Sequence, residues 1–349
     1  MAEKKERIEE TVVISTRIRF ARNFAAYPFP KKMDDAQAAD IVYLVEKGLQ
    51  GLGDDYRRYD IGKMSKDDAI WLLEQHLISP ALSRSKRGAA FVSADKCLSI
   101  MVNEEDHLRE QYFYKGFELY RAYERISAVD DGLSANFDFA FDEKWGYLTA
   151  CPSNLGTGMR ASIMVFLPGL ARSGGLKELL PELKARGITV RGAFGEGTSA
   201  EGYVYQISNE LTLGMSEADI LRDMVGTAHK ISEMELRARD DMLIASEKEI
   251  RDRCLRAYGT LTHCAILGMK EFLSKIADVK LGVVLGFFET DDLSELDNFS
   301  EDMRPISLCR NNGLPKLSEK ECDEVRAETV VAALPELVRI VKGTRKARR

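Results

Sequence analysis

Short hydrophobic or alternating stretches recur along the chain up to about residue 213, and their two-residue period predicts strands. Two of them close on each other through a turn at residues 144–146, which favours an antiparallel sheet. Helices are predicted at residues 160–167 and 176–185, ended by Pro168-Gly169 and by Gly187. The predicted strands cover residues 12–20, 98–102, 137–141 with 147–149, 189–191 and 203–207.

Helical periodicity dominates the rest of the chain. Ser216 with Asp219 is a partial capping box at the start of a long amphipathic helix, and Ser318 with Glu321 marks a second start. Residues 290–315, rich in Asp, Ser, Asn and Gly, are predicted as a loop. The whole pattern predicts an α+β fold, with an antiparallel sheet flanked by helices followed by an α-helical C-terminal domain.

Length and composition agree with two folded domains, which we place at residues 1–225 and 226–349. The 349 residues are 45% hydrophobic and 30% charged, and the net charge of −6 argues against general nucleic-acid binding. No apolar run approaches the roughly 20 residues of a membrane span, and no signal sequence opens the chain, so we expect a cytoplasmic protein. The six cysteines lie far apart without a Cys-x-x-Cys pair, which indicates free thiols rather than a zinc site.

The first strand carries the first candidate chemistry. Its two-residue period places Ser15, Arg17 and Arg19 on one face and apolar residues such as Ile18 on the other. Two neighbouring guanidinium groups repel each other unless an anion lies between them, and their planar forks match phosphate oxygens. This face is either half of a polyphosphate clamp or a solvated strand face.

A run of acidic residues follows the strand at residues 98–102. Glu104, Glu105 and Asp106 are consecutive carboxylates, an arrangement that suits a cation such as a guanidinium. Arg109 lies four residues after Glu105, about one helical turn if a helix begins here. The alternative is a helix N-terminus decorated with acids that suit its dipole.

Two glycine-containing segments complete the candidates. Residues 151–160 run from Cys151 to Arg160 and are predicted to cradle an anion and open a helix, although they lack the Walker ending. Residues 191–198 carry three glycines after a strand. Cys151 is either a tuned thiolate or a core cysteine, and the isolated His76 and His107 either touch a nucleotide or are structural.

Together these motifs resemble the ATP:guanidino phosphotransferases, and the helical remainder is similar to that of the family's bacterial protein arginine kinases. The resemblance implies a guanidino kinase or glutamine synthetase-like catalytic domain. It also implies ATP as the phosphoryl donor, with Mg2+ bound through the nucleotide phosphates and no metal site of the protein's own. The implied ATP-binding residues are Ser15, Thr16, Arg17, Ile18, Arg19, His76, Arg109, Arg160, Ala161, Ser162, Ile163, Met164, Arg191, Gly192, Ala193, Phe194, Gly195 and Glu196.

The same resemblance implies catalytic roles. Glu105 orients the substrate guanidinium and accepts its proton, because a guanidinium is a poor nucleophile until a carboxylate localises its lone pair. Glu196 is implied as a second carboxylate at the guanidinium, with Cys151 beside it. The C-terminal motif that resembles a phosphoarginine pocket has Cys322 in place of its first arginine, and it retains Asp323, Arg326 and Ala327.

Two departures from the free-guanidine kinases favour a protein substrate. Ser15 lies near the start of the chain, where those enzymes carry a helical domain of about a hundred residues. Phe194 and Ser199 stand where their last loop carries a phosphate arginine and a second carboxylate. The alternatives are a kinase for free arginine or another small guanidine, and a catalytically silent adaptor.

The implied partners are proteins with exposed arginine, a zinc-binding activator, a Clp-type protease complex and a transcriptional repressor. The implied assembly is a homodimer, which the wide apolar stripes of the C-terminal helices also favour. We expect no direct contact with nucleic acid or a membrane.

Overall fold

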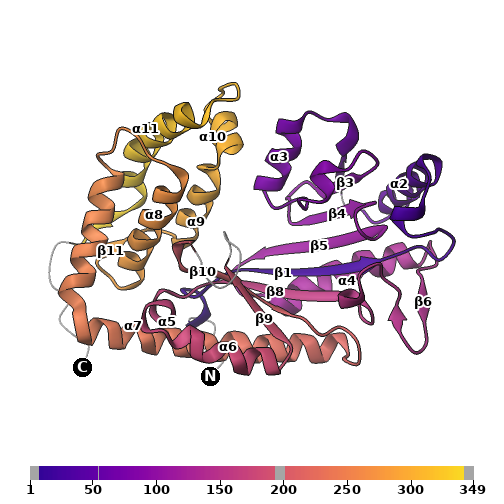
Figure 1. Ribbon diagram of the computed structural model, residues 1–349, viewed down its shortest axis with the longest axis horizontal. Coiled ribbons are helices and arrows are strands. Elements are labelled where there is room, and N and C mark those ends of the chain that lie inside the picture. The colour runs from indigo at the N-terminus through magenta and orange to yellow at the C-terminus, as the bar shows by residue number, and fades with distance from the viewer. Residues whose placement is uncertain (1–7, 54, 193–200, 342–349) are drawn as a thin grey trace.

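An eight-stranded antiparallel sheet is the centre of the fold in this computed structural model, which describes residues 8–53, 55–192 and 201–341 (Figure 1). The strand order is β2-β3-β4-β5-β1-β8-β10-β9. The strands are β1 (Val13–Arg22), β2 (Tyr56–Asp60), β3 (Ala89–Ser93), β4 (Leu98–Val102), β5 (Leu108–Lys115), β8 (Met159–Phe166), β9 (Ile188–Gly192) and β10 (Val204–Asn209).

One face of the sheet is apolar and is covered by helices. The side chains of Ile18, Phe20, Ala161 and Ile163 are fully buried there among apolar residues of the covering helices. A short hairpin of β6 (Phe141–Asp142) and β7 (Gly146–Tyr147) lies beside this layer. The helices are α2 (Asp35–Gln50), α4 (Leu119–Ser134), α5 (Pro168–Ser173), α6 (Gly175–Ala185) and the first part of α7 (Glu217–Leu261).

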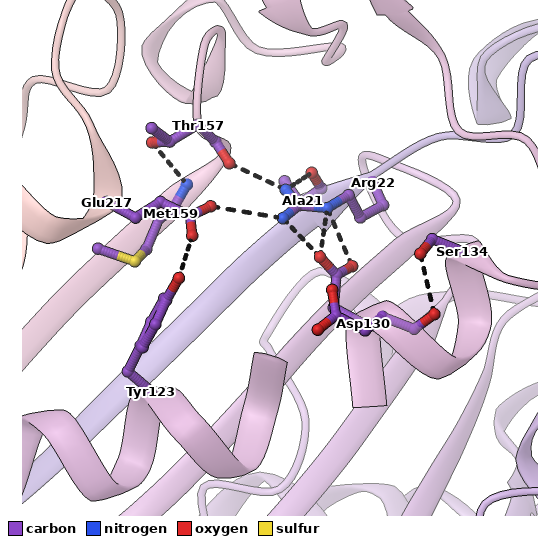
Figure 2. Close-up of polar contacts among 9 residues, drawn as sticks. Ala21, Arg22, Tyr123, Asp130, Ser134, Thr157, Met159 and Glu217 are labelled. Atoms are coloured by element: carbon purple, nitrogen blue, oxygen red, sulfur yellow. Dashed lines mark hydrogen bonds and ion pairs between the residues drawn. The ribbon is translucent and has the colours of Figure 1, made fainter. Parts of the chain in front are cut away.

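A buried ion pair fixes the end of β1 on this covered face. Arg22 donates through Nε and Nη2 to both oxygens of Asp130 on α4, at 2.8–3.1 Å, and through Nη1 to the Thr157 carbonyl (Figure 2). Its guanidinium also stacks 3.6 Å from the ring centroid of Tyr147. Burial would lower the pKa of Arg22, but the charge and hydrogen bonds of Asp130 raise it.

The opposite face of the sheet is flanked by two units. At the β2–β3–β4 end, α3 (Lys66–Glu74) packs with its own small apolar core on Ala90 and Met101. At the other end stand the C-terminal helices, which share a second core with Phe166 of β8. That unit comprises the end of α7, α8 (Met269–Val284), α9 (Leu293–Asp302), α10 (Pro305–Asn311), α11 (Glu319–Leu337) and the hairpin of β11 (Phe288–Glu289) and β12 (Arg339–Ile340).

Helix α7 joins the two cores, since Ile231 belongs to the first and Ile250 to the second. Its dihedral angles are helical except at Ser246. The predicted domain boundary at residue 225 lies inside α7 and stays a prediction. In the described part of the chain, no helix is long and apolar enough to span a membrane.

The α+β prediction is confirmed, and so are both helix starts: Ser216 accepts from the Asp219 amide, and Ser318 with Glu321 forms a full capping box. Two predicted segments are wrong. Residues 160–167 fall in strand β8 rather than a helix, because alternate residues face the polar and the apolar side of the sheet. Residues 290–315 hold helices α9 and α10 instead of a loop.

Candidate active site

Five arginines converge on the face of the sheet that the large helices leave uncovered. Arg19 on β1 lies directly opposite Arg160 on β8, and Arg17 on the same strand lies opposite Ser162. Opposed residues of an antiparallel pair project to the same side, and the register continues to Arg109 on β5 and Arg191 on β9. We call this surface, defined by Arg17, Arg19, Arg109, Arg160 and Arg191, the arginine face.

These guanidinium groups shift one another's pKa values. Burial and the positive charges of Arg109 and Arg160 lower the pKa of Arg17 to about 10. Burial, together with Arg17, Arg109 and Arg160, lowers the pKa of Arg19 well below its usual value. The pKa of Arg160 is also lowered, by burial and then by Arg191 and Arg109. Such a cluster is stabilised when an anion enters it.

Some N–H donors of the arginine face have acceptors among the described residues, and others do not. Arg17 donates to the Gln206 amide oxygen at 2.9 Å, and Arg109 donates to Glu104 at 2.9 Å. The buried Nε atoms of Arg19 and Arg160 have no hydrogen-bond partner within the described residues. Buried N–H groups of this kind are normally satisfied, so these two donors are available to oxygen atoms of a bound phosphate.

The acidic loop lies directly against this face. Glu104, only 4% exposed, accepts from Arg109 and from the Ser79 hydroxyl, whereas Glu105 projects into solvent. The expectation that Glu105 and Arg109 share a helical turn is wrong, because Arg109 is on strand β5 and its carboxylate partner is Glu104. Glu105 is therefore an exposed carboxylate, adjacent in sequence to the Glu104 that contacts the arginine face.

The Cys151 loop is bonded to the acidic loop. Asp106, the residue after Glu105, accepts from the amide of Ala150, the residue before Cys151, at 2.6 Å. Asp106 also accepts from the Asn23 side chain at 2.7 Å. The Cys151 thiol lies 3.1 Å from the Ser153 hydroxyl. The loop passes through Gly156 and Gly158 at positive φ into β8, so the expectation that it opens a helix is wrong.

His76 stands at the edge of a cavity of about 530 Å³ that also reaches Arg17 and Gln206. It adopts φ 57°, and its carbonyl oxygen accepts from the Gln111 side chain at 2.7 Å. His107, in contrast, is fully buried, contacts the Phe24 amide and the Pro28 carbonyl, and has its pKa lowered by burial. His107 is therefore structural.

The other predicted ATP-binding residues fall into two groups, because alternate residues of a strand face opposite sides of the sheet. Ser15, Ser162 and Met164 lie on the arginine face by register. The side chains of Thr16, Ile18, Ala161 and Ile163 are buried on the opposite face, and contact of these residues with the nucleotide stays a prediction. Gly192 ends β9. Ala193, Phe194, Gly195 and Glu196 lie outside the described residues.

The predicted phosphoarginine pocket is occupied by internal contacts. Arg326, 1% exposed, donates to the carbonyls of Met303 and Leu267 at 3.0 and 2.7 Å and to the Asp323 carboxylate at 2.6 Å. Ala327 is fully buried beside it. These contacts join α11 to the end of α9, and phosphoarginine binding here stays a prediction.

Sequence reasoning overlooked two polar residues of the site, Gln111 and Gln206, and it did not identify Glu104 as the partner of Arg109. Gln206 lies inside a predicted strand and Gln111 outside every predicted element, and the role of each depends on pairing between distant strands. The two-residue alternation of residues 108–115 is the signal that could have placed Arg109 and Gln111 together on one strand face.

Family models cover both parts of the chain. ATP:guanido phosphotransferase, C-terminal catalytic domain, matches residues 40–238, and Protein-arginine kinase McsB C-terminal domain matches residues 247–342. The chain therefore belongs to the ATP:guanido phosphotransferase family and, within it, to the protein-arginine kinases.

Curated relatives of similar length agree. A protein-arginine kinase of Caldanaerobacter subterraneus is 41% identical over 93% of this chain and 98% of its own length. The one from Bacillus subtilis is 39% identical over 82% of this chain and 80% of its own length.

Solved structures of guanidino kinases share the fold. Lombricine kinase is 27% identical with a TM-score of 0.59, over 68% of each chain. The duplicated taurocyamine kinase of Schistosoma mansoni, solved with transition state analog components, is 29% identical with a TM-score of 0.58 over 64% of this chain. This chain spans 33% of that double-length enzyme.

Proposed function

We propose that this protein transfers the γ-phosphoryl group of ATP to arginine side chains of other proteins. The observation that carries the proposal is the arginine face, which combines like charges with buried donors that have no partner among the described residues and which contacts the acidic loop of Glu104 and Glu105 through Arg109. Nothing in a structural scaffold requires such a cluster, whereas a polyphosphate does.

The arginines bind and align the nucleotide. Arg17, Arg19 and Arg160 donate to phosphate oxygens, and their charges stabilise the transferring group, since phosphoryl transfer depends mainly on alignment and electrostatics. Mg2+, bound through the nucleotide phosphates, offsets part of the phosphate charge. The Glu104 contact holds the Arg109 side chain in place on the same face.

Glu105 acts on the other substrate. Its carboxylate orients the arriving guanidinium and takes a proton from the attacking nitrogen as the N–P bond forms. The bond from the γ-phosphorus to the bridging oxygen breaks, and ADP leaves with the electron pair. Glu196 as a second carboxylate, and Cys151 as a neighbour that tunes the guanidinium, are included on the family resemblance.

A protein rather than a free amino acid is proposed as the substrate because the named relatives at about 40% identity are protein-arginine kinases. The finer roles belong to the same proposal. They are action in the cytoplasm, assembly as a homodimer, marking of client proteins for degradation, and work with a zinc-binding activator, a Clp-type protease and a stress-response repressor.

Incubation with labelled ATP, Mg2+ and either casein or free arginine tests the proposal, with mass spectrometry at neutral pH to preserve the P–N bond. Phosphate on casein arginine supports it. Label on free arginine alone identifies a kinase for the small guanidine instead. Transfer to neither substrate, with an activator protein also supplied, favours the silent adaptor.

Glu105→Gln then tests the carboxylate. Loss of a general base lowers turnover by roughly 10²–10⁴-fold. Glu143→Gln is the matched control, because Glu143 is an exposed carboxylate in the turn between β6 and β7. Turnover near the wild-type level in Glu105→Gln would remove Glu105 from the mechanism.

A further inference from the structure

Helix α3 and the C-terminal helices α9 and α10 meet along a polar seam. The carboxylate of Glu74, the last residue of α3, accepts from the amides of Ile306 and Ser307 at 3.1 and 2.8 Å, so it caps the first turn of α10. Asp68 of α3 also forms an ion pair with Arg310 of α10. The seam therefore fixes α9 and α10 relative to the segment that leads into His76.

His76 follows Glu74 by two residues and is held from two sides. Its carbonyl oxygen is bound by Gln111, which lies opposite Arg19 on the arginine face. Its Nε2 atom lies 3.3 Å from the carboxylate of Glu301 on α9. The positive φ of His76 is a strained conformation for a residue with a side chain, and it persists because these contacts hold the segment.

The Glu301 carboxylate is itself fixed. Burial would raise its pKa, but hydrogen bonds from His76 and Arg304 lower it to about 2, so the group is charged at neutral pH. The imidazole of His76 keeps 46% of its side-chain surface exposed. The ring is thus oriented from behind by Glu301 while it remains accessible from the cavity.

The cavity beside His76 is shared between the two parts of the molecule. Its floor includes Arg17 and Gln206 of the sheet, and its far wall is formed by Ala277 of α8 and by Asp297 and Glu301 of α9. A volume of about 530 Å³ lies within the range of small-molecule sites. Because Arg17 of the arginine face also lines this cavity, the cavity can hold the remaining atoms of a nucleotide whose phosphates bind that face.

We propose that Glu301 is a positioning residue for the nucleotide, acting through His76, so that helix α9 completes the ATP site from the C-terminal part of the chain. This inference rests on the proposed function. Because Glu301 fixes the imidazole before the nucleotide arrives, binding does not have to order the ring, and affinity rises accordingly.

Equilibrium binding of Mg2+-ADP and steady-state kinetics of Glu301→Gln test the role. The variant keeps the size of the side chain and removes its charge. We expect the dissociation constant for ADP and the KM for ATP to rise roughly tenfold, the effect of one charge-assisted hydrogen bond. The value of kcat at saturating ATP should stay within about twofold, because the reacting atoms are untouched.

Two comparisons separate positioning from a general loosening of the seam. Asp68→Asn breaks the ion pair to Arg310 without touching His76, so its ADP affinity should match the wild type. His76→Gln should weaken ADP binding as much as Glu301→Gln does, and the double variant should be no weaker than the worse single variant. His76→Gln also keeps the test available if Glu301→Gln fails to fold.

Each remaining outcome overturns a specific claim. Additive losses in the double variant, equal losses in Asp68→Asn, or unchanged or tighter ADP binding in a folded Glu301→Gln overturn the role of Glu301. If the wild-type protein itself binds no Mg2+-ADP, the proposed kinase function fails, and this inference fails with it.

Discussion

Arginine side chains have opposite electrostatic environments on the two faces of the central sheet. On the covered face, Arg22 is buried with Asp130 as a bidentate partner, and the pKa of Arg22 is raised (Figure 2). On the arginine face, Arg17 and Arg19 lie against other arginines, and their pKa values are lowered. The strand supplies both environments, because residues an even number apart share a face and the others do not.

This contrast separates stability from function along a single strand. A buried charge with its counter-ion holds the fold together, and removing the counter-ion is strongly destabilising. A cluster of like charges with too few counter-ions lowers stability and is retained because a substrate supplies the missing charge. Three experiments test the contrast and a fourth tests the seam at Glu301, in order of decreasing effect.

Arg19→Met should have the largest effect. Loss of an arginine that stabilises the transferring phosphoryl group lowers turnover by roughly 10³–10⁵-fold. The free energy of unfolding should stay the same or rise, because repulsion with Arg17 and Arg160 is relieved. Arg256→Met, at an exposed arginine, is the control for both readouts. A large loss of stability in Arg19→Met would contradict the contrast.

Asp130→Asn should lower stability and leave turnover unchanged, the opposite of Arg19→Met. It removes the bidentate counter-ion of the buried Arg22 and leaves the more distant Glu217 carboxylate, 3.9 Å away, and we expect a loss of about 3–5 kcal/mol in the free energy of unfolding. Urea titration measures it, with the exposed Asp252→Asn as the matched variant. Turnover of the folded fraction should remain near wild type. A loss below about 1 kcal/mol would show that Arg22 does not depend on Asp130.

Tripolyphosphate should stabilise the wild-type protein by filling the arginine face. At 100 times its Kd, a ligand that binds only the folded state adds about 2.7 kcal/mol. The melting temperature should therefore rise in wild type and much less in Arg19→Met. Sodium chloride at equal ionic strength controls for screening. An equal rise in both proteins would place the polyanion elsewhere.

The smallest expected effect is the contribution of the Glu301 carboxylate at the seam to the pH dependence of the free energy of unfolding. Its folded-state pKa of about 2 lies below the ordinary 4.5, so its contribution to stability is present above pH 4.5 and is lost as the pH falls toward 2. The stability difference between wild type and Glu301→Gln should shrink below pH 4.5, by at most about 1.4 kcal/mol per pH unit. A difference independent of pH between 7 and 3 would contradict the pairing with His76 and Arg304.

Local patterns were enough to predict strands β1, β4, β9 and β10 of the sheet and to single out Arg17, Arg19 and Arg160, whereas β2, β3, β5 and β8 were not predicted. The strand β8 was missed because Ala161 and Met164 are good helix formers, and here the tertiary pairing with β1 outweighs propensity. The pairing of Arg109 with Glu104 was missed for the same reason, since a strand was read as a helix.

The contact between His76 and Glu301 lay beyond sequence reasoning altogether. No local period connects a residue that follows α3 with one in α9, and the segment holding Glu301 was predicted to be a loop. Contacts of this kind depend on how the C-terminal helices dock, which a single sequence does not encode in its local pattern.

The number of residues in α7 fixes how far the C-terminal helices are rotated about the axis of α7 relative to the sheet. One residue added between Ile231 and Ile250 would turn the C-terminal helices by about 100° around the axis of α7 and advance them by about 1.5 Å. Glu301 would then swing away from His76, and the packing of the second core against Phe166 of β8 would be disrupted as well. Chimeras that join the sheet of one relative to the helices of another therefore keep a common ATP site only when they preserve this residue count.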